Sequence, residues 1–278
     1  MRARRSLALA AVVLTVGCAS ATNYPDPTGP RFAKALAAPA TASSGLRVVT
    51  FNIKYGREAA AAAALLQSDP HLAGADVIAL QEMDEASTDL IARALSMNYV
   101  YYPASRHPVP GKNFGNAVLS RWPLEEDVKL VLPHIGRLRK GQRIAVGATM
   151  RIPGREAVRV YSVHLETPVS ISGKGRRDQA EVILADAARH PRVIIAGDFN
   201  SRGILDLFAR RGYRWLTRRV GRTISRFSWD HVAVKGFQLR DCASVGALAS
   251  ARKVSDHRPV WADLTDTGVS AMTAAGCP

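Results

Sequence analysis

Short apolar runs that end in a polar side chain recur along this chain, and they constrain its fold more than any other feature. In the clearest of them, residues 192–200, a strand-like run ends in Asp198 and Asn200. Side chains two residues apart on an extended strand point to the same side, so this carboxylate and this amide can converge on one point. Such a pair could activate a water and stabilise an oxyanion, although short Asp-x-Asn segments also form turns.

Five further segments repeat the arrangement. Three apolar runs, 47–51, 76–81 and 158–163, are followed by Asn52, Glu82 and His164, whereas Asp230 and the pair Asp256-His257 each stand just before such a run. Enzymes build their sites on rigid scaffolds, often where strands end and loops begin. Six such segments in one chain are hard to explain as separate accidents, so we expect their polar side chains to share one site.

The chain has many expected strands and few expected helices. We expect strands at 46–52, 76–81, 98–103, 116–121, 127–132, 142–151, 157–165, 192–198, 229–234 and 258–264, and helices at 58–68, 85–97, 174–189 and 203–211. The two types do not alternate strictly, which argues against a simple doubly wound sheet. Roughly 220 residues follow the N-terminal region, enough for one large domain with a well-buried core.

The ordered series of these motifs resembles the endonuclease/exonuclease/phosphatase superfamily. The matching segments are Phe-Asn52-Ile-Lys-Tyr-Gly, Gln-Glu82, Gly115-Asn-Ala-Val-Leu-Ser-Arg121, His164-Leu, Gly-Asp198-Phe-Asn200, Asp230-His-Val and Ser-Asp256-His257-Arg-Pro-Val. Each motif is weakly specific, but their joint order is strongly specific and runs from Leu46 to Leu264. The resemblance implies an α/β (α+β) fold of four layers, in which two mixed sheets pack face to face between helices, with the site in a cleft at one edge.

Phosphoester hydrolysis, the reaction that the resemblance implies, requires neutralised phosphoryl oxygens, an aligned water and a stabilised leaving group. Glu82 is the best candidate metal ligand, because a carboxylate at a strand end is both rigid and anionic. Asn52 could hold a metal-bound water, and Asp256 could add a second carboxylate. So sparse a set of oxygen ligands favours Mg²⁺ or Mn²⁺ over Ca²⁺.

Asp230 and His257 are expected to form an orienting pair, in which the carboxylate fixes the imidazole tautomer. The resemblance supports this pairing, since members of the superfamily join the histidine of the Ser-Asp-His motif to the earlier aspartate. The sequence leaves the general base open between Asp198, which we slightly favour, and His257. Asn200 and His164 would contact the non-bridging oxygens of the phosphate.

Several other polar residues have weaker support from the sequence. Asn116 is a further candidate for substrate contact, and Arg176 and Gln179 match a helical Arg-x-x-Gln of many superfamily members that would brace the site. The remaining histidines that we assessed have no motif and are interpreted as structural: His71, His107, His134 and His231.

The sequence indicates in part which branch of the superfamily the chain resembles. The abasic-site DNA repair branch usually carries an acid or amide where this chain has Lys54, and an aromatic-amide motif where it has His164-Leu. These departures favour the branch of sphingomyelinases, inositol-phosphate phosphatases and related secreted bacterial hydrolases. The formal net charge is +15, and eight arginines but one acid, Asp206, lie within residues 202–226. Such a patch would attract phosphates, nucleic acid or anionic lipid, or would simply be a solvated face.

Four regions are expected along the chain: a signal peptide at 1–18, a flexible linker at 19–45, the catalytic domain at 46–265 and a loose tail at 266–278. A basic start and the apolar run 7–16 indicate export, and Gly17-Cys18 resembles a lipoprotein box. Lipidated Cys18 would make a membrane tether, with ordinary signal cleavage and a periplasmic or secreted protein as the alternative. Cys242 could then pair with Cys277 or be a buried apolar residue.

The sequence therefore predicts a monomeric, divalent-metal-dependent phosphodiesterase of the cell envelope, acting on a lipid headgroup or small phosphodiester. The alternative is a secreted nuclease, which the aromatic residues Tyr213, Trp215 and Phe227 beside the arginines would suit. A third hypothesis is a non-catalytic envelope binding protein of the same fold.

Overall fold

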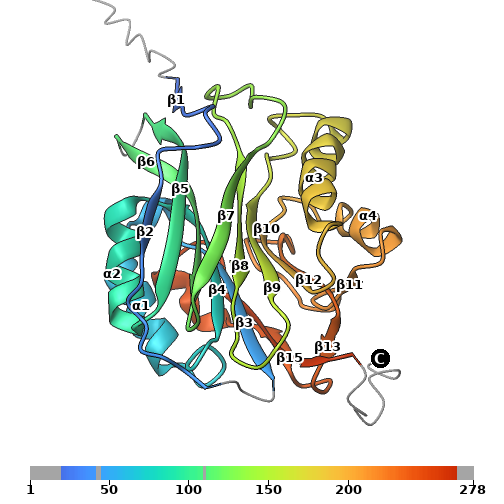
Figure 1. Ribbon diagram of the computed structural model, residues 1–278. Coiled ribbons are helices and arrows are strands. Elements are labelled where there is room, and N and C mark those ends of the chain that lie inside the picture. The colour runs from blue at the N-terminus through green and yellow to red at the C-terminus, as the bar shows by residue number, and fades with distance from the viewer. Residues whose placement is uncertain (1–19, 42–44, 109–110, 268–278) are drawn as a thin grey trace, which may run out of the picture.

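Two β-sheets pack face to face, with helices on both outer faces (Figure 1). The structure is a computed structural model that describes residues 20–41, 45–108 and 111–267. The arrangement is the four-layered α/β sandwich that the resemblance implied, and all ten strands and four helices expected from the sequence are present with boundaries shifted by a few residues.

The first sheet has nine strands. Its main path runs in the order β1-β5-β6-β4-β3-β15-β13, while β2 pairs with β5 and β14 pairs with β15. β3 and β4 are parallel, and the other pairs are antiparallel. The strands are β1 (Thr22–Asn23), β2 (Phe32–Lys34), β3 (Leu46–Asn52), β4 (Val77–Met83), β5 (Asn98–His107), β6 (Lys112–Ser120), β13 (Phe237–Leu239), β14 (Val245–Ala247) and β15 (Val260–Asp266).

The second sheet has six strands in the order β11-β12-β10-β9-β8-β7, and only β9 and β10 are parallel. The strands are β7 (Leu124–Val131), β8 (Ile144–Met150), β9 (Val158–His164), β10 (Val193–Asp198), β11 (Arg214–Trp215) and β12 (Asp230–Lys235). The helices are α1 (Ala59–Ser68), α2 (Glu85–Leu95), α3 (Gly173–Ala187) and α4 (Leu205–Arg210), with short 3₁₀ turns at Lys54–Gly56 and Ala249–Lys253.

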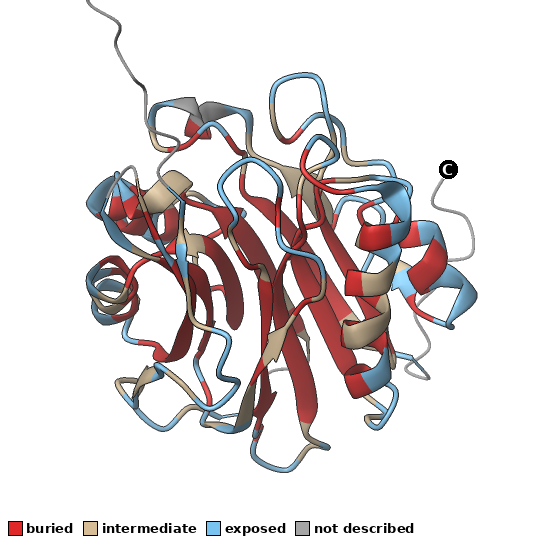
Figure 2. Cartoon of the chain, turned by 90° about the horizontal axis from the view of Figure 1, so that it is seen from above, coloured by how far each residue is buried: buried red, intermediate tan, exposed pale blue. Residues whose placement is uncertain are grey.

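Strand alternation divides the apolar residues among three cores. Val48 and Ile194 face the space between the sheets. Their neighbours Val49 and Ile195 face outward, Val49 into the core beneath α1 and α2 and Ile195 into the core beneath α3 and α4. Successive side chains on a strand point to opposite faces, so a nearly continuous apolar run supplies both the core between the sheets and the core under the adjacent helices. Figure 2 shows the result, buried strands in two layers with partly exposed helices outside.

The two pairs of parallel strands position the polar side chains that end them. The carboxyl ends of β3 and β4 lie side by side in the first sheet, and those of β9 and β10 lie side by side in the second. Gly197 allows the second pair to approach closely, because a Cβ at this position would lie 2.0 Å from the backbone oxygen of Val163. The side chain that follows, Asp198, is thereby held at the edge where the sheets meet.

The expectation of a flexible linker over 19–45 is wrong for the described residues 20–41. This segment lies along β5, where β1 and β2 add to the edge of the first sheet. The ammonium of Lys129, which is buried, donates to the carbonyl oxygens of Tyr24, Asp26 and Gly29. Backbone pairing and polar contacts of this kind leave no apolar period in the sequence, so composition alone could not reveal them.

Both ends of the chain fall outside the described residues, and the predicted signal peptide with Cys18 lies there. The predicted tail 266–278 is described only for its first two residues, Asp266 at the end of β15 and Thr267. Cys242 takes part in a disulfide bond. None of the helices formed by the described residues combines the length and apolar character needed to cross a membrane.

Replacing Lys129 with Met is expected to weaken the docking of the N-terminal segment. The variant loses three charge-assisted hydrogen bonds, so we expect a loss of about 1.5–3 kcal/mol in the free energy of unfolding, measured by urea denaturation. The matched control is Lys34→Met, which removes a half-exposed ion pair with Asp89 and should cost less than about 1 kcal/mol. Equal losses in the two variants would contradict the anchoring role of Lys129.

Candidate active site

Polar side chains from both sheets meet at the edge described above. β3 and β4 supply Asn52 and Glu82, and β9 and β10 supply His164 and Asp198. Asp230, at the start of β12, and His257, just before β15, complete the group. All six residues come from the strand-end motifs of the sequence, so the structure brings together what the sequence predicted to be one site.

The carboxylate of Asp198 lies at the centre of the group and is buried. Its Oδ2 accepts a hydrogen bond from Asn52 Nδ2 at 3.1 Å and lies 3.5 Å from His164 Nε2 and 3.7 Å from His257 Nε2. Its Oδ1 accepts from the backbone N–H of Asn200 at 2.9 Å. Burial raises the pKa of Asp198, and the nearby His257 opposes that rise. This carboxylate therefore has donors on several sides and an unusually basic character.

His257 and Asp230 form the expected pair. His257 Nδ1 lies 3.0 Å and 2.9 Å from the two carboxylate oxygens of Asp230, which is fully buried. A carboxylate can only accept, so Nδ1 carries the hydrogen and Nε2 is directed toward Asp198. Burial alone would lower the pKa of His257, but Asp230 and Asp198 together raise it. The imidazole is thus held as a cation beside Asp198.

His164 has the opposite character because of a residue that the sequence did not single out. Arg143 Nη1 donates to His164 Nδ1 at 3.1 Å, which leaves Nε2 as the protonated nitrogen, directed toward Asp198. Burial lowers the pKa of His164 well below its usual value, and the positive charges of Arg143 and His257 act in the same direction. His164 is therefore a neutral donor.

Arg143 is itself held by a carboxylate. Its Nε and Nη2 donate to the two oxygens of Glu166 at 3.2 Å and 3.3 Å, and the backbone N–H of Glu166 donates to Gln179 on α3. A lone arginine before an apolar strand gives no signal in a chain with 38 lysines and arginines, so the sequence could not have identified it. This bidentate pair fixes the guanidinium of Arg143 in its position beside His164.

Glu82 is positioned by an irregular backbone. It lies at a bulge in the pairing of β4 with β6 and has a φ of 59°. A left-handed non-glycine residue is costly, and such residues cluster at functional sites. Asn52 Nδ2 and the backbone N–H of Tyr55 each donate to the Glu82 carboxylate at 3.2 Å. Burial raises the pKa of Glu82, and the positive charges of Arg143 and His257 oppose the rise.

A hard cation fits the carboxylate of Glu82. Glu82 is partly exposed, borders a cavity and offers oxygen atoms, the donors that Mg²⁺ prefers. Atoms of Asp198, Asp230 and His257 also lie within 4.8 Å of one another, as a metal site would require. An ion there would have to break the hydrogen bond from His257 to Asp230, so we assign the cation to the Glu82 side.

Asp256 and Asn52, the other two candidate ligands, already have partners within the protein. The Asp256 carboxylate is half exposed and forms an ion pair with the ammonium of Lys54 at 2.9 Å. Asn52 turns its amide nitrogen to Glu82 and Asp198, and its oxygen accepts from the backbone N–H of Lys54 at 3.1 Å. Asn52 thus bridges the carboxylates of Glu82 and Asp198, and Lys54 supplies a positive charge beside Asp256.

Asn116, on β6, contacts the second sheet. Its amide nitrogen donates to the carbonyl oxygens of Ile144 and Ser162 at 2.9 Å and 3.2 Å, so this buried side chain joins the two sheets. Asn116 therefore braces the two sheets, and its contact with the substrate stays a prediction, because an isolated motif cannot distinguish a bracing amide from a substrate-binding amide.

The helix α3 braces the site as expected, through contacts with Asn200 and with the loop before β8. Asn200 has a φ of 48° and donates through Nδ2 to the Leu165 oxygen at 2.9 Å. Arg176 donates to the Asn200 oxygen at 3.1 Å, and Gln179 donates to the Pro133 oxygen at 2.8 Å. Both α3 side chains therefore hold loops beside the site.

A cavity of about 250 Å³ opens directly beside the catalytic group. Glu82, Arg143 and Arg139 border it, and the rings of Tyr55, His107 and Phe114 form an aromatic cluster on its wall, with centroids 4.8–5.8 Å apart. His107, interpreted as structural from the sequence, thus lies against the cavity. This space would take the part of a substrate that adjoins its phosphate.

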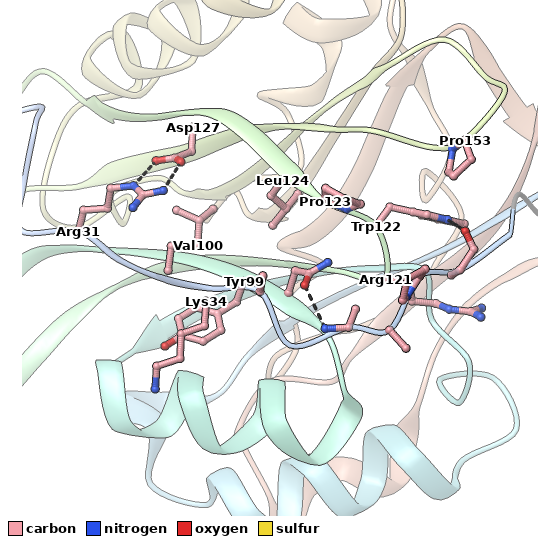
Figure 3. A pocket seen from close by; sticks show the side chains of 17 residues that line it. Arg31, Lys34, Tyr99, Val100, Arg121, Trp122, Pro123, Leu124, Asp127 and Pro153 are labelled. Atoms are coloured by element: carbon pink, nitrogen blue, oxygen red, sulfur yellow. Dashed lines mark hydrogen bonds and ion pairs between the residues drawn. The ribbon is translucent and has the colours of Figure 1, made fainter.

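A larger cavity of about 540 Å³ lies elsewhere, between the N-terminal segment and β5 and β7 (Figure 3). Its wall is mainly apolar, with Tyr99, Trp122 and Leu124, and the ion pair of Arg31 with Asp127 stands at its edge. Its lining includes none of the strand-end residues of the candidate site, whereas Glu82 borders the smaller cavity.

Residues 49–257 match the model of the endonuclease/exonuclease/phosphatase family, and the chain belongs to this family. Its members are metal-dependent phosphoesterases and nucleases. The superfamily prediction is therefore confirmed. No protein with a curated description matches the chain.

Solved structures show the same fold. An endonuclease/exonuclease/phosphatase from Beutenbergia cavernae is 22% identical, with a TM-score of 0.66 over 81% of this chain and 72% of that one. The sphingomyelinase C of Streptomyces griseocarneus is 19% identical, with a TM-score of 0.58 over 81% and 100%. The D. rerio TDP2 complex with a single-strand DNA product is 19% identical, with a TM-score of 0.59 over 80% and 100%.

Replacing Lys54 with Met is expected to tighten the binding of Mg²⁺ or Mn²⁺. The ammonium neutralises Asp256, a candidate ligand of the cation, and a half-exposed ion pair of this kind is worth about 1 kcal/mol. We therefore expect affinity to rise about fivefold, measured by Mn²⁺ titration with electron paramagnetic resonance. Lys34→Met, which breaks an ion pair on α2, should leave affinity unchanged. Unchanged or weaker binding in Lys54→Met would contradict the placement of the cation.

Proposed function

We propose that this protein hydrolyses phosphodiester bonds with Mg²⁺ or Mn²⁺, acting on a lipid headgroup or a small phosphodiester at the cell envelope. The observation that carries the proposal is the buried Asp198, which is flanked by a neutral and a cationic histidine and is bridged through Asn52 to Glu82 at the edge of a cavity. Hydrolysis needs one group that accepts a proton from water and others that stabilise the charged phosphoryl oxygens, and this arrangement supplies both.

Asp198 is the better candidate for the general base. Its pKa is raised by burial, which brings its basicity closer to that required near neutral pH. His257 is held as a cation by Asp230, and a cation is suited to stabilising phosphoryl charge rather than accepting the first proton. We therefore assign positioning and deprotonation of the water to Asp198, and stabilisation of the phosphoryl oxygens to His257.

The non-bridging oxygens would also receive hydrogen bonds from His164 and Asn200. His164 keeps its Nε2 hydrogen because Arg143 occupies Nδ1. Asn200 uses its amide nitrogen for one bond to Leu165, and that nitrogen carries a second hydrogen. Arg143 contacts His164 and adds a fixed positive charge beside it. This charge would stabilise the negative charge of the transition state.

Glu82 and Asp256 would hold the metal ion, with Asn52 orienting Glu82. The ion supplies charge neutralisation at the phosphoryl and leaving-group oxygens. Glu82 itself is fixed by Asn52 and the backbone of Tyr55, so its carboxylate needs no rearrangement to bind a cation.

Several observations favour a small or lipid phosphodiester as substrate. The cavity beside the site holds about 250 Å³, enough for a headgroup. The N-terminal sequence favours export, with Cys18 as the proposed lipid attachment, and Lys54 and His164 depart from the DNA repair pattern. One structural neighbour is a sphingomyelinase C.

A secreted nuclease is the second candidate, and a specific surface favours it. A tight turn at 223–227, closed by hydrogen bonds between Thr223, Ile224 and Phe227, pairs with His257. It presents the exposed Phe227, which stacks on Trp229 at 4.6 Å, and Arg226 lies over the Phe227 ring. Exposed aromatic rings beside arginines bind single-stranded nucleic acid.

A non-catalytic binding protein is the third hypothesis, and the complete set of acids and histidines argues against it.

Residues 19–278 should hydrolyse bis-p-nitrophenyl phosphate or sphingomyelin in Mg²⁺ or Mn²⁺ and lose this activity in EDTA. p-Nitrophenyl phosphate, plasmid DNA, single-stranded DNA and RNA complete the panel. Cleavage of the diester or the lipid with intact nucleic acid supports the leading proposal. Cleavage of nucleic acid that weakens steeply with salt would support the nuclease instead. No turnover of any substrate would contradict both.

Glu82→Gln tests the role of the metal in the same assay. We expect at least a hundredfold loss of turnover, because the variant keeps the shape of the side chain but lacks the charge that holds the cation. The control is Glu125→Gln, which removes an exposed ion pair with Arg151 on β7 and should retain full activity. Full activity of Glu82→Gln at saturating Mg²⁺ would refute the metal assignment.

A further inference from the structure

The mouth of the active-site cavity carries an unusual concentration of exposed aliphatic side chains. Five large apolar residues are exposed among those that the structure describes, and three of them are Ile135 at 50%, Leu138 at 66% and Val169 at 75%. They lie on two loops, 132–143 between β7 and β8 and 166–172 between β9 and α3. We call these two loops the rim. The rim borders the cavity through Leu138, Gly136 and Ser170.

The two loops of the rim contact each other. Arg137 donates through its backbone N–H to the Ser170 oxygen at 3.3 Å, and Gly136 donates to the Gly141 oxygen at 3.1 Å. The loops also pack closely, because a Cβ at Gly136 would lie 2.5 Å from the Glu166 carboxylate. The exposed aliphatic groups are therefore presented together on one surface, and no internal apolar partner covers them.

Positive charge surrounds these aliphatic groups. Arg137, Arg139 and Lys140 are exposed, and no carboxylate of the described residues forms an ion pair with them. Aliphatic side chains interspersed with unpaired cations are typical of surfaces that bind anionic lipid, where apolar groups enter the acyl boundary and cations meet the headgroups. Nucleic acid would favour aromatic rings in such positions, and the rim exposes aliphatic ones.

The N-terminal segment reaches the described structure at the same place. The backbone N–H of Ala21 donates to the Arg139 oxygen at 2.8 Å, and Asn23 bonds the Lys140 oxygen and the Gln142 N–H at 2.7 Å each. In Figure 1, β1 lies beside the loop between β7 and β8 at the upper end of the molecule. Cys18, the proposed site of lipid attachment, precedes Ala21 by three residues in the sequence.

We propose that the rim is a membrane-docking surface that seats the active-site cavity against an anionic lipid bilayer. A lipid on Cys18 would add a covalent tether to the docking that the rim provides. Docking would present headgroups to the cavity without extraction of a lipid from the membrane. This inference deepens the proposed function, since it specifies how a lipid phosphodiester reaches Asp198.

The test measures binding of residues 19–278 to vesicles. The two sheets and their three cores lie within residues 20–267, and this protein lacks Cys18, so any binding comes from the folded protein and not from a lipid on Cys18. We expect cosedimentation with phosphatidylcholine vesicles that contain 30% phosphatidylglycerol, weaker binding to pure phosphatidylcholine, and a loss of affinity with salt. No binding to the anionic vesicles would overturn the proposal.

Two variants of the same protein locate the binding surface. Ile135→Asp combined with Val169→Asp should lower vesicle affinity at least tenfold, since both side chains would leave the acyl boundary. Arg137→Ala combined with Lys140→Ala should lower affinity for the anionic vesicles by about fivefold per charge. Leu90→Asp, on the exposed face of α2, is the matched control and should bind as the unmodified protein does. Equal binding by all variants would overturn the proposal.

Activity on soluble bis-p-nitrophenyl phosphate keeps this test separate from the proposed function. Ile135 and Val169 do not line the cavity, so their double variant should retain that activity while losing turnover of vesicle substrate. Absence of soluble activity in the unmodified protein would refute the proposed function and leave docking intact. If the rim variants instead lose affinity for single-stranded DNA and keep vesicle binding, the rim is a nucleic-acid surface and the docking proposal fails.

Discussion

The buried carboxylate of Asp198 is the constraint on which the rest of the site depends. Removing a carboxylate from water costs several kcal/mol unless donors replace the lost hydration. Asn52 on β3 and the backbone N–H of Asn200 after β10 donate to Asp198, and Nε2 of His164 and of His257 lie 3.5 Å and 3.7 Å from its Oδ2. The sheets must therefore meet at this edge in one register. The same contacts that make the site also join the two halves of the sandwich.

The surroundings of Asp198 give similar side chains different properties. His257 faces two carboxylates and is held as a cation, whereas His164 faces Arg143 and stays neutral. Glu82 and Asn200 reach the site through left-handed backbone conformations, which the packed strands around them enforce. A neutral donor, a cation and an anionic ligand are thus fixed before the substrate arrives, as electrostatic stabilisation requires.

The sequence predicted the sandwich, its long strands and six members of the site, because apolar alternation and strand-end polar residues are local signals. It was less informative where contacts are long-range. Asn116 has the same motif context as a substrate ligand but joins the sheets, and Arg143 has no motif at all. The N-terminal segment lacks an apolar period, yet it pairs with β5 through its backbone. The two loops of the rim are likewise distant in the sequence, since Leu138 and Val169 are over 30 residues apart, and folding brings the loops together.

We infer that Asp230, His257 and Asp198 act as one unit at the junction of the sheets. A double-mutant cycle on kcat for bis-p-nitrophenyl phosphate tests it most directly, with Asp230→Ala, His257→Ala and the double variant. Each single change should cost a factor of about 10²–10⁴, and the double variant should be about as slow as His257→Ala alone. Losses that multiply in the double variant would show that the two residues act independently and would contradict the account.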